Sequence, residues 1–227
     1  MARLLGFTGA KVPRVGSIGS PGEPPVHSAA GRRLTTKVAM TSLPTNGTVR
    51  PIVRWGDPIL HRASQPVVEF GDQLAAVVAD MTATMRAADG VGLAANQIGV
   101  DLALFVFDCP DADEVSQQGI ICNPVLTLPT GRGRHLDDAE EGCLSLPGAF
   151  IACARPDEAS AVGVDHRGLP VRVHGTGLLA RCLQHESDHL VGTVFADRLA
   201  RGTRRKLLAS AEEFAGDYPP SWPVGSD

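Results

Sequence analysis

The sequence predicts an α+β fold. Apolar residues first recur at helical spacing, several short strand-like segments then follow one another, and a second helical segment comes after them. Strands that succeed each other without intervening helices favour this class, because a doubly wound parallel sheet needs a helix after each strand. With 227 residues, the chain can form one large domain, or one domain and an extension.

The first helix is expected to begin at Asp72, as its cap, and to end at Asp89 and Gly90. Between them, apolar residues at three- and four-residue steps share one helical face: Leu74, Val77, Val78, Met81 and Met85. Apolar segments between Gly, Pro and Asp turns predict strands over residues 102–107, 119–122, 125–128, 161–164 and 171–174. A second helix is expected from Thr176, as N-cap, through Leu190, and a third over residues 203–215.

Composition excludes several classes of protein. The net charge is −4, so no overall basic field attracts DNA or an anionic membrane surface. The longest apolar run, residues 102–107, is far shorter than the ~20 residues of a membrane helix. Five cysteines, an odd number scattered along the chain, do not form a secreted disulfide framework. We therefore expect neither a DNA-binding nor a membrane protein.

Residues 1–47 differ from the rest of the chain. They contain seven Gly, five Pro, six Lys or Arg and one acidic residue, Glu23, and sustain no apolar period. Such a stretch cannot offset its ordering entropy by burial, so we expect a disordered N-terminal extension. After this extension we expect a catalytic domain over residues 48–200, followed by a C-terminal helix and tail over residues 201–227. A translation start at Met40 and an organellar transit peptide are alternative interpretations of the extension.

A metal-binding pattern lies within the second predicted helix. Residues 185–189 read His-Glu-Ser-Asp-His, which is H-E-x-x-H. Four residues at ~100° each bring His189 to within ~40° of His185 around the helix and about 6 Å along it, so both imidazoles can bind one metal ion. Glu186 lies next to the first ligand, where it can act on water without being a ligand itself. The pattern therefore predicts a hydrolytic metal site.

Such a site needs a third protein ligand and an open position. In the extended zincin pattern this ligand is a His six residues after the second one, but that position is Phe195 here. Glu212 or Glu213 could complete another zincin type, which leaves a metalloprotease as an alternative function. Cys143, in an acidic and turn-rich segment, is a candidate as ligand or as nucleophile.

The segment at residues 90–99, Gly-Val-Gly-Leu-Ala-Ala-Asn-Gln-Ile-Gly, superficially fits a dinucleotide-binding fingerprint. That fingerprint follows a strand and opens a helix, whereas here a helix precedes it and strand-like residues follow. We therefore reject a nucleotide site. Small residues instead let a substrate approach the backbone closely, and Gln97 is a candidate donor to a developing oxyanion.

Three segments together resemble the motifs of peptide deformylases. Residues 90–99 match G-x-G-x-A-A-x-Q, residues 141–145 match E-G-C-L-S, and residues 184–190 match Q-H-E-x-D-H-L, in this order. The similarity extends over residues 49–200. It implies short, mostly antiparallel strands around a central helix that carries H-E-x-x-H. It also implies a metal-dependent hydrolase that removes the formyl group from N-formyl-methionyl N-termini of newly made polypeptides and releases formate.

The resemblance also implies roles for individual residues. Cys143, His185 and His189 would hold one divalent ion, Fe(II) in the working enzyme, with Zn(II) or Ni(II) able to occupy the site. Glu186 would be the general acid and base. Gln97 and the backbone N–H of Leu144 would stabilise the oxyanion. Gly92 would bind substrate, beside an apolar methionine pocket lined by Val91, Leu178, Cys182 and the flank of His185.

The remaining expectations concern charges and partners. Glu141 and Arg155 are either supports of the site or solvated surface charges. A local basic cluster consists of Arg198, Arg201, Arg204, Arg205 and Lys206. The resemblance implies that nascent chains are met at the ribosome, where such a cluster could contact RNA phosphates, although a solvated helix face is the alternative. We expect a bacterial cytoplasmic protein, or an organellar one if residues 1–47 act as a transit peptide.

Overall fold

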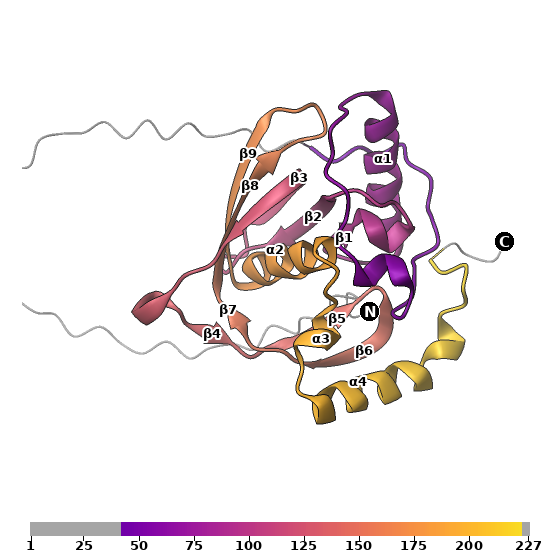
Figure 1. The fold of residues 1–227 in the computed structure, drawn as a ribbon, viewed down its shortest axis with the longest axis vertical. Coiled ribbons are helices and arrows are strands. Elements are labelled where there is room, and N and C mark those ends of the chain that lie inside the picture. The colour runs from indigo at the N-terminus through magenta and orange to yellow at the C-terminus, as the bar shows by residue number, and fades with distance from the viewer. Residues whose placement is uncertain (1–41, 224–227) are drawn as a thin grey trace, which may run out of the picture.

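The computed structural model describes residues 42–223 (Figure 1). Within them, one antiparallel sheet has the strand order β1-β2-β3-β8-β9. Its strands are β1 (Gly92–Ala94), β2 (Leu104–Pro110), β3 (Ser116–Thr127), β8 (Glu158–Val164) and β9 (Pro170–Thr176). Two shorter ribbons pair β4 (Leu136–Asp137) with β7 (Arg155–Pro156), and β5 (Glu140–Cys143) with β6 (Leu146–Ala152). The predicted α+β class with mostly antiparallel strands is confirmed.

Two helices of the described chain, at residues 72–87 and 177–190, lie on opposite faces of this sheet, whereas the helix at residues 201–213 packs against the β5–β6 ribbon. The α-helices are α1 (Asp72–Ala87), α2 (Gly177–Leu190), α3 (Phe195–Arg198) and α4 (Arg201–Glu213). Short 3-10 helices are η1 (Pro58–His61), η2 (Ala95–Ile98), η3 (Gly131–Gly133) and η4 (Ala215–Asp217). None of the helices between residues 42 and 223 is both long enough and apolar enough to cross a bilayer.

Strand β2 explains how the two long helices are held. Phe105 and Phe107 belong to the apolar cluster that also contains Leu179 and Leu183 of α2. The alternate residues, Leu104 and Val106, belong to the cluster that contains Met81 and Met85 of α1. Because successive side chains of a strand point to opposite faces, β2 is buried on both sides, and its sequence is a continuous apolar run.

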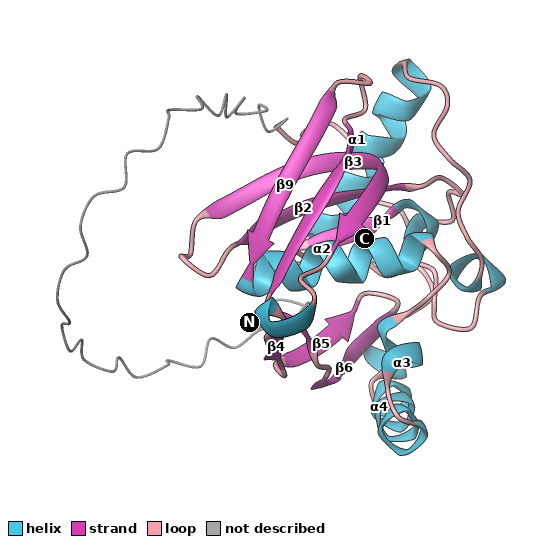
Figure 2. Cartoon of the chain, turned by 60° about the vertical axis from the view of Figure 1, so that its left-hand side comes forward, coloured by secondary structure: helices cyan, strands magenta, loops and turns pink. Residues whose placement is uncertain are grey.

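Helix α2 crosses one face of the sheet and occupies the centre of the fold (Figure 2). It spans residues 177–190, as predicted, and Thr176 is at the N-cap position. However, the Thr176 hydroxyl does not cap the helix and accepts a hydrogen bond of 3.2 Å from the backbone N–H of Ala112 instead. Asp72 was placed wrongly as a cap, since α1 begins at Asp72 itself and its N-cap is Gly71.

Several predicted strands change in length or number. The two strands expected over residues 119–122 and 125–128 form the single strand β3, whose register to β8 shifts between Cys122 and Val125. Asn123, at φ 51°, lies at this irregularity, followed by Pro124, which has no N–H for the ladder. The strand expected over residues 102–107 lies at 104–110, and the third helix begins at Arg201 rather than at residue 203.

The predicted N-terminal extension falls mostly outside the described residues, because the description begins at residue 42. Leu43 is only 6% exposed and packs in the cluster around α1. The packed chain therefore begins before residue 48, where we expected the domain boundary. At the other end, the backbone O of Trp222 accepts a hydrogen bond of 3.0 Å from the N–H of Ile52, so the C-terminal end of the described chain lies beside residue 52.

Candidate metal centre

Three potential ligand atoms converge at one buried point between the β5–β6 ribbon and α2. Cys143 is the last residue of β5, and His185 and His189 lie one turn apart on α2. Cys143 Sγ lies 3.3 Å from His189 Nε2, which in turn lies 3.3 Å from His185 Nε2. A tetrahedral ion with M–N bonds of ~2.0 Å and an M–S bond of ~2.3 Å separates its ligand atoms by roughly 3.3–3.6 Å. The donor set and its spacing therefore fit one small divalent ion.

A buried carboxylate orients the first imidazole. Glu141, which is fully buried, lies 2.7 Å through Oε1 from His185 Nδ1. A proton on Nδ1 in this contact leaves Nε2 free to face Cys143 and His189. Burial alone would raise the pKa of the Glu141 carboxyl, but hydrogen bonds from His185 and Arg155 hold it well below its ordinary value. Glu141 is thus ionised and acts as an acceptor.

Two arginines keep this carboxylate in place. Arg155 donates from Nε and Nη2 to the two Glu141 oxygens, both at 2.6 Å, and Arg181 Nη1 donates to Oε2 at 3.0 Å. Arg155 Nη1 also donates to Asp188 at 2.9 Å, and Asp188 accepts hydrogen bonds from Arg198. Arg155 is 2% exposed, so its interpretation as a solvated surface charge is wrong.

Glu186 is a buried carboxyl beside this group. Within the described chain its Oε2 atom has no hydrogen-bond partner. Burial raises the pKa of Glu186 to about 7, although the neighbouring His185 acts in the opposite direction. A carboxyl with a pKa near neutrality can both accept and return a proton under physiological conditions.

The backbone N–H of Ala94 orients the Gln97 side chain toward the same point. Its Oε1 accepts a hydrogen bond of 2.9 Å from the N–H of Ala94, which directs Nε2 the other way. Nε2 lies 3.6 Å from Cys143 Sγ and 3.3 Å from Ser145 Oγ. Leu144, in the turn between β5 and β6, is buried next to Cys143. The structure therefore places Gln97 Nε2 beside Cys143, the residue that Leu144 directly follows in the chain.

The residues expected to bind substrate also come together. Cys182 Sγ lies 3.6 Å from the carbonyl O of Val91, and both belong to the cluster on which Leu178 packs. A Cβ atom on Gly92 would lie 2.4 Å from Glu186 Oε1 and 2.8 Å from Cys182 Sγ. Only glycine allows α2 to approach β1 this closely.

The alternative third ligands lie elsewhere. Phe195 is buried, and its ring centroid lies 5.9 Å from that of His185, so it packs against a candidate ligand. Glu212 and Glu213 are exposed on α4. Cys143, His185 and His189 are the group of metal-capable side chains found between residues 42 and 223. The zincin alternative with Glu212 or Glu213 as a ligand therefore has no geometric support.

Two polar residues near the centre were missed from the sequence. Asn96 donates from Nδ2 to the carbonyl O of His189 at 2.7 Å, which ties the glycine-rich segment to the last turn of α2. Arg181 precedes His185 by one helical turn and is 2% exposed. Its position, four residues before a predicted ligand on the same face, was a usable signal, whereas Asn96 looks like an ordinary loop residue.

These features define a class. An H-E-x-x-H helix packed on an antiparallel sheet brings two imidazoles and a thiol to one point, beside a carboxyl that titrates near neutrality. That combination is typical of a metal-dependent hydrolase.

Comparison with known proteins identifies the family. The polypeptide deformylase family model matches residues 49–205. The chain is 51% identical over 174 residues to peptide deformylase 1 of Streptomyces avermitilis, an alignment that covers 76% of this chain and 80% of that protein. It is 43% identical over 189 residues to peptide deformylase 2 of Corynebacterium efficiens, covering 79% and 95% of the two chains.

Solved structures support the same family assignment. A peptide deformylase from Legionella pneumophila aligns with a TM-score of 0.66 at 37% identity, covering 74% of this chain and 96% of that one. The Synechococcus elongatus enzyme in complex with actinonin aligns with a TM-score of 0.66 at 33% identity, covering 76% and 95%. The chain belongs to the polypeptide deformylase family, whose members are metal-dependent hydrolases that remove N-formyl groups from nascent polypeptides.

Proposed function

We propose that this chain deformylates N-formyl-methionyl N-termini with one divalent ion held by Cys143, His185 and His189. The observation that carries the proposal is the spacing of these buried ligand atoms, which all lie within 4.8 Å of one another, with His189 Nε2 at 3.3 Å from each of the other two. A bound ion supplies Lewis acidity, which makes water available as a nucleophile at neutral pH. One thiolate and two imidazoles suit Fe(II), Zn(II) and Ni(II), and we propose Fe(II) as the working metal on the family resemblance.

Glu186 moves the proton in this mechanism. Its carboxylate takes a proton from the water that attacks the formyl carbon, and the resulting acid returns the proton to the departing amine. The pKa of about 7 supports both steps, since either form is then accessible near neutral pH. The products are formate and a peptide with a free N-terminus.

Gln97 and Leu144 stabilise the charge that develops on the formyl oxygen. The Gln97 amide is held by Ala94, so its Nε2 donor needs no reorientation during the reaction. The backbone N–H of Leu144 is the second donor. A single preorganised donor of this kind typically contributes about 3–4 kcal/mol to stabilising a transition state.

Substrate binding is assigned to β1 and the start of α2. Val91, Leu178 and Cys182 would surround the methionine side chain, since all three belong to or pack on one apolar cluster. In the sheet order β1 is an edge strand, so its outer backbone groups are placed to pair with an extended peptide beside Gly92. We propose this edge as the path of the formylated chain.

The proposal extends to the location of the enzyme and to a further partner. The relatives compared above are bacterial, which supports a bacterial cytoplasmic enzyme. In the basic cluster, Arg198 is paired with Asp188 and Arg204 with Asp197. A ribosomal contact through α4 would therefore depend on Arg201, Arg205 and Lys206, all exposed. Neutralising these three side chains should weaken co-sedimentation with ribosomes, and unchanged co-sedimentation would end this part of the proposal.

The central test separates metal binding from proton transfer. Anaerobically purified protein should release formate from an N-formyl-methionyl peptide. Glu186→Gln should keep one equivalent of metal but lose about 10²–10⁴-fold in turnover. Cys143→Ala should lose the metal, whereas Cys122→Ala, a buried free thiol in β3, should keep it. Full turnover by Glu186→Gln would refute the proton-transfer role.

A further inference from the structure

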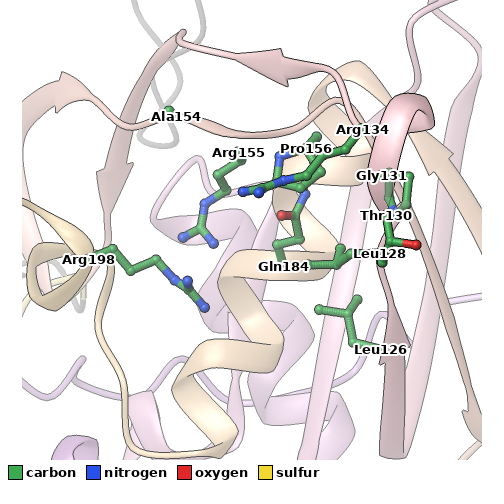
Figure 3. Close-up of a pocket in the computed structure, with 11 residues that line it drawn as sticks. Leu126, Leu128, Thr130, Gly131, Arg134, Ala154, Arg155, Pro156, Gln184 and Arg198 are labelled. Carbon is green, nitrogen blue, oxygen red and sulfur yellow. The ribbon is translucent and has the colours of Figure 1, made fainter.

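One hollow of the described surface is lined by none of the three candidate metal ligands. It opens between the end of β3, the η3 segment, β7 and α3, and has a volume of about 370 Å³ (Figure 3). Leu126, Leu128 and Pro156 give it apolar walls. Its volume is within the range of small-molecule sites, at the lower end.

The polar lining of this hollow is cationic. Three guanidinium groups, those of Arg134, Arg155 and Arg198, line it, and no carboxylate does. Figure 3 shows Arg134 and Arg198 extending toward the hollow from opposite sides. Other hollows of the described surface differ in this respect, since those lined by Asp89 and by Glu212 include acids.

The three arginines differ in how many of their guanidinium N–H groups already donate hydrogen bonds within the chain. Arg155 donates to Glu141 and Asp188, so these two carboxylates neutralise its charge within the chain. Arg198 uses Nε and Nη2 on Asp188, and its side chain is 48% exposed. For Arg134, no ion pair or side-chain hydrogen bond involves the guanidinium within residues 42–223. Of the three lining arginines, only Arg134 therefore presents a charge that no carboxylate of the described chain neutralises.

We propose that this hollow is a binding site for a small organic phosphate, distinct from the metal centre. The phosphate dianion would lie between Arg134, whose guanidinium can donate two parallel hydrogen bonds to phosphate oxygens, and Nη1 of Arg198, the nitrogen that Asp188 does not use. An apolar body of the ligand would pack on Leu126, Leu128 and Pro156. The inference goes beyond deformylation and does not depend on the assigned catalytic roles.

Calorimetric titration of the zinc-loaded full chain tests the proposal, with phenyl phosphate and inorganic phosphate as probes at matched ionic strength. Phenyl phosphate should bind more tightly than inorganic phosphate, because only its ring can bury area against the apolar walls. Arg134→Gln should weaken phenyl phosphate binding by about tenfold or more, as expected for the loss of a charge-assisted contact.

The matched control is Arg132→Gln. Arg132 is exposed on the same η3 segment but does not line the hollow, so its replacement should change the affinity by less than about twofold if the site is specific. Thr130→Glu, which adds a carboxylate to the exposed rim, should abolish binding and serves as a second variant. Equal effects of Arg132→Gln and Arg134→Gln would overturn the proposal. An unchanged affinity of Arg134→Gln for phenyl phosphate would also overturn the proposal, because the probe would then bind elsewhere, for example at the metal.

Discussion

Glu141→Gln measures how much of the stability depends on the carboxylate beside His185. Gln has nearly the same shape, so no cavity is created, but Arg155 and Arg181 keep their buried charges while the negative charge that both contact is lost. The N–H₂ group of the new amide would also face the N–H donors of the arginines, with which it cannot form hydrogen bonds. Removing one partner of a buried ion pair typically costs about 3–5 kcal/mol. We expect a loss in this range in the free energy of unfolding.

Urea unfolding followed by circular dichroism at fixed free zinc measures this loss. Glu140→Gln is the control, because Glu140 is the exposed preceding residue on β5 and its replacement should change the free energy by less than about 0.5 kcal/mol. The pKa of Glu141 is lowered in the folded state, so its contribution is complete above the ordinary value of 4.5 and declines as the pH falls below it. The difference in the free energy of unfolding between wild type and Glu141→Gln should therefore become smaller as the pH falls below 4.5. A loss below about 1 kcal/mol at pH 7 would refute the assignment.

Three further outcomes are expected. Gly92→Ala places a Cβ atom 2.4 Å from Glu186 Oε1, so turnover of the formylated peptide should fall about 10²-fold, while Gly133→Ala, which has open space, should leave it unchanged. In metal-free protein, a carbon-13 NMR titration should give the Glu186 carboxyl a midpoint near 7, with the basic form lost as the pH falls through that value; a midpoint at 4.5 would contradict the effect of burial. Leu43→Ala should cost about 2–4 kcal/mol in urea unfolding, and an unchanged midpoint would mean that Leu43 is not part of the core.

The elements that the sequence predicted well are those whose apolar pattern has a period. Helix α1 was predicted from apolar residues at three- and four-residue steps and α2 from Thr176 as its N-cap, and the bounds of both differ from the prediction by no more than three residues. The relation of His185 to His189 follows from helical geometry alone. A local pattern of this kind can be recognised without knowing which elements the helix packs against.

The β5–β6 ribbon was missed because it has no such pattern. Its strands read Glu-Glu-Gly-Cys and Leu-Pro-Gly-Ala-Phe-Ile-Ala, without alternation of polar and apolar residues. Gly142 is required there because a Cβ atom would lie 2.2 Å from the Phe150 ring. Cys143 could be assigned as a third ligand only through the family motif, since nothing local indicates that the end of this ribbon meets α2.

The buried charges were the hardest feature to foresee, and they also govern the metal centre. Glu141 meets Arg155, Arg181 and His185 at sequence separations of 14, 40 and 44 residues, so no local window contains the pairs. Arg181 and His185, one turn apart on α2, donate to different oxygens of the same carboxylate. Because Arg155 also holds both oxygens, the carboxylate cannot rotate away from His185. The Nδ1 proton of His185 is thereby fixed, and Nε2 is left free to bind the metal.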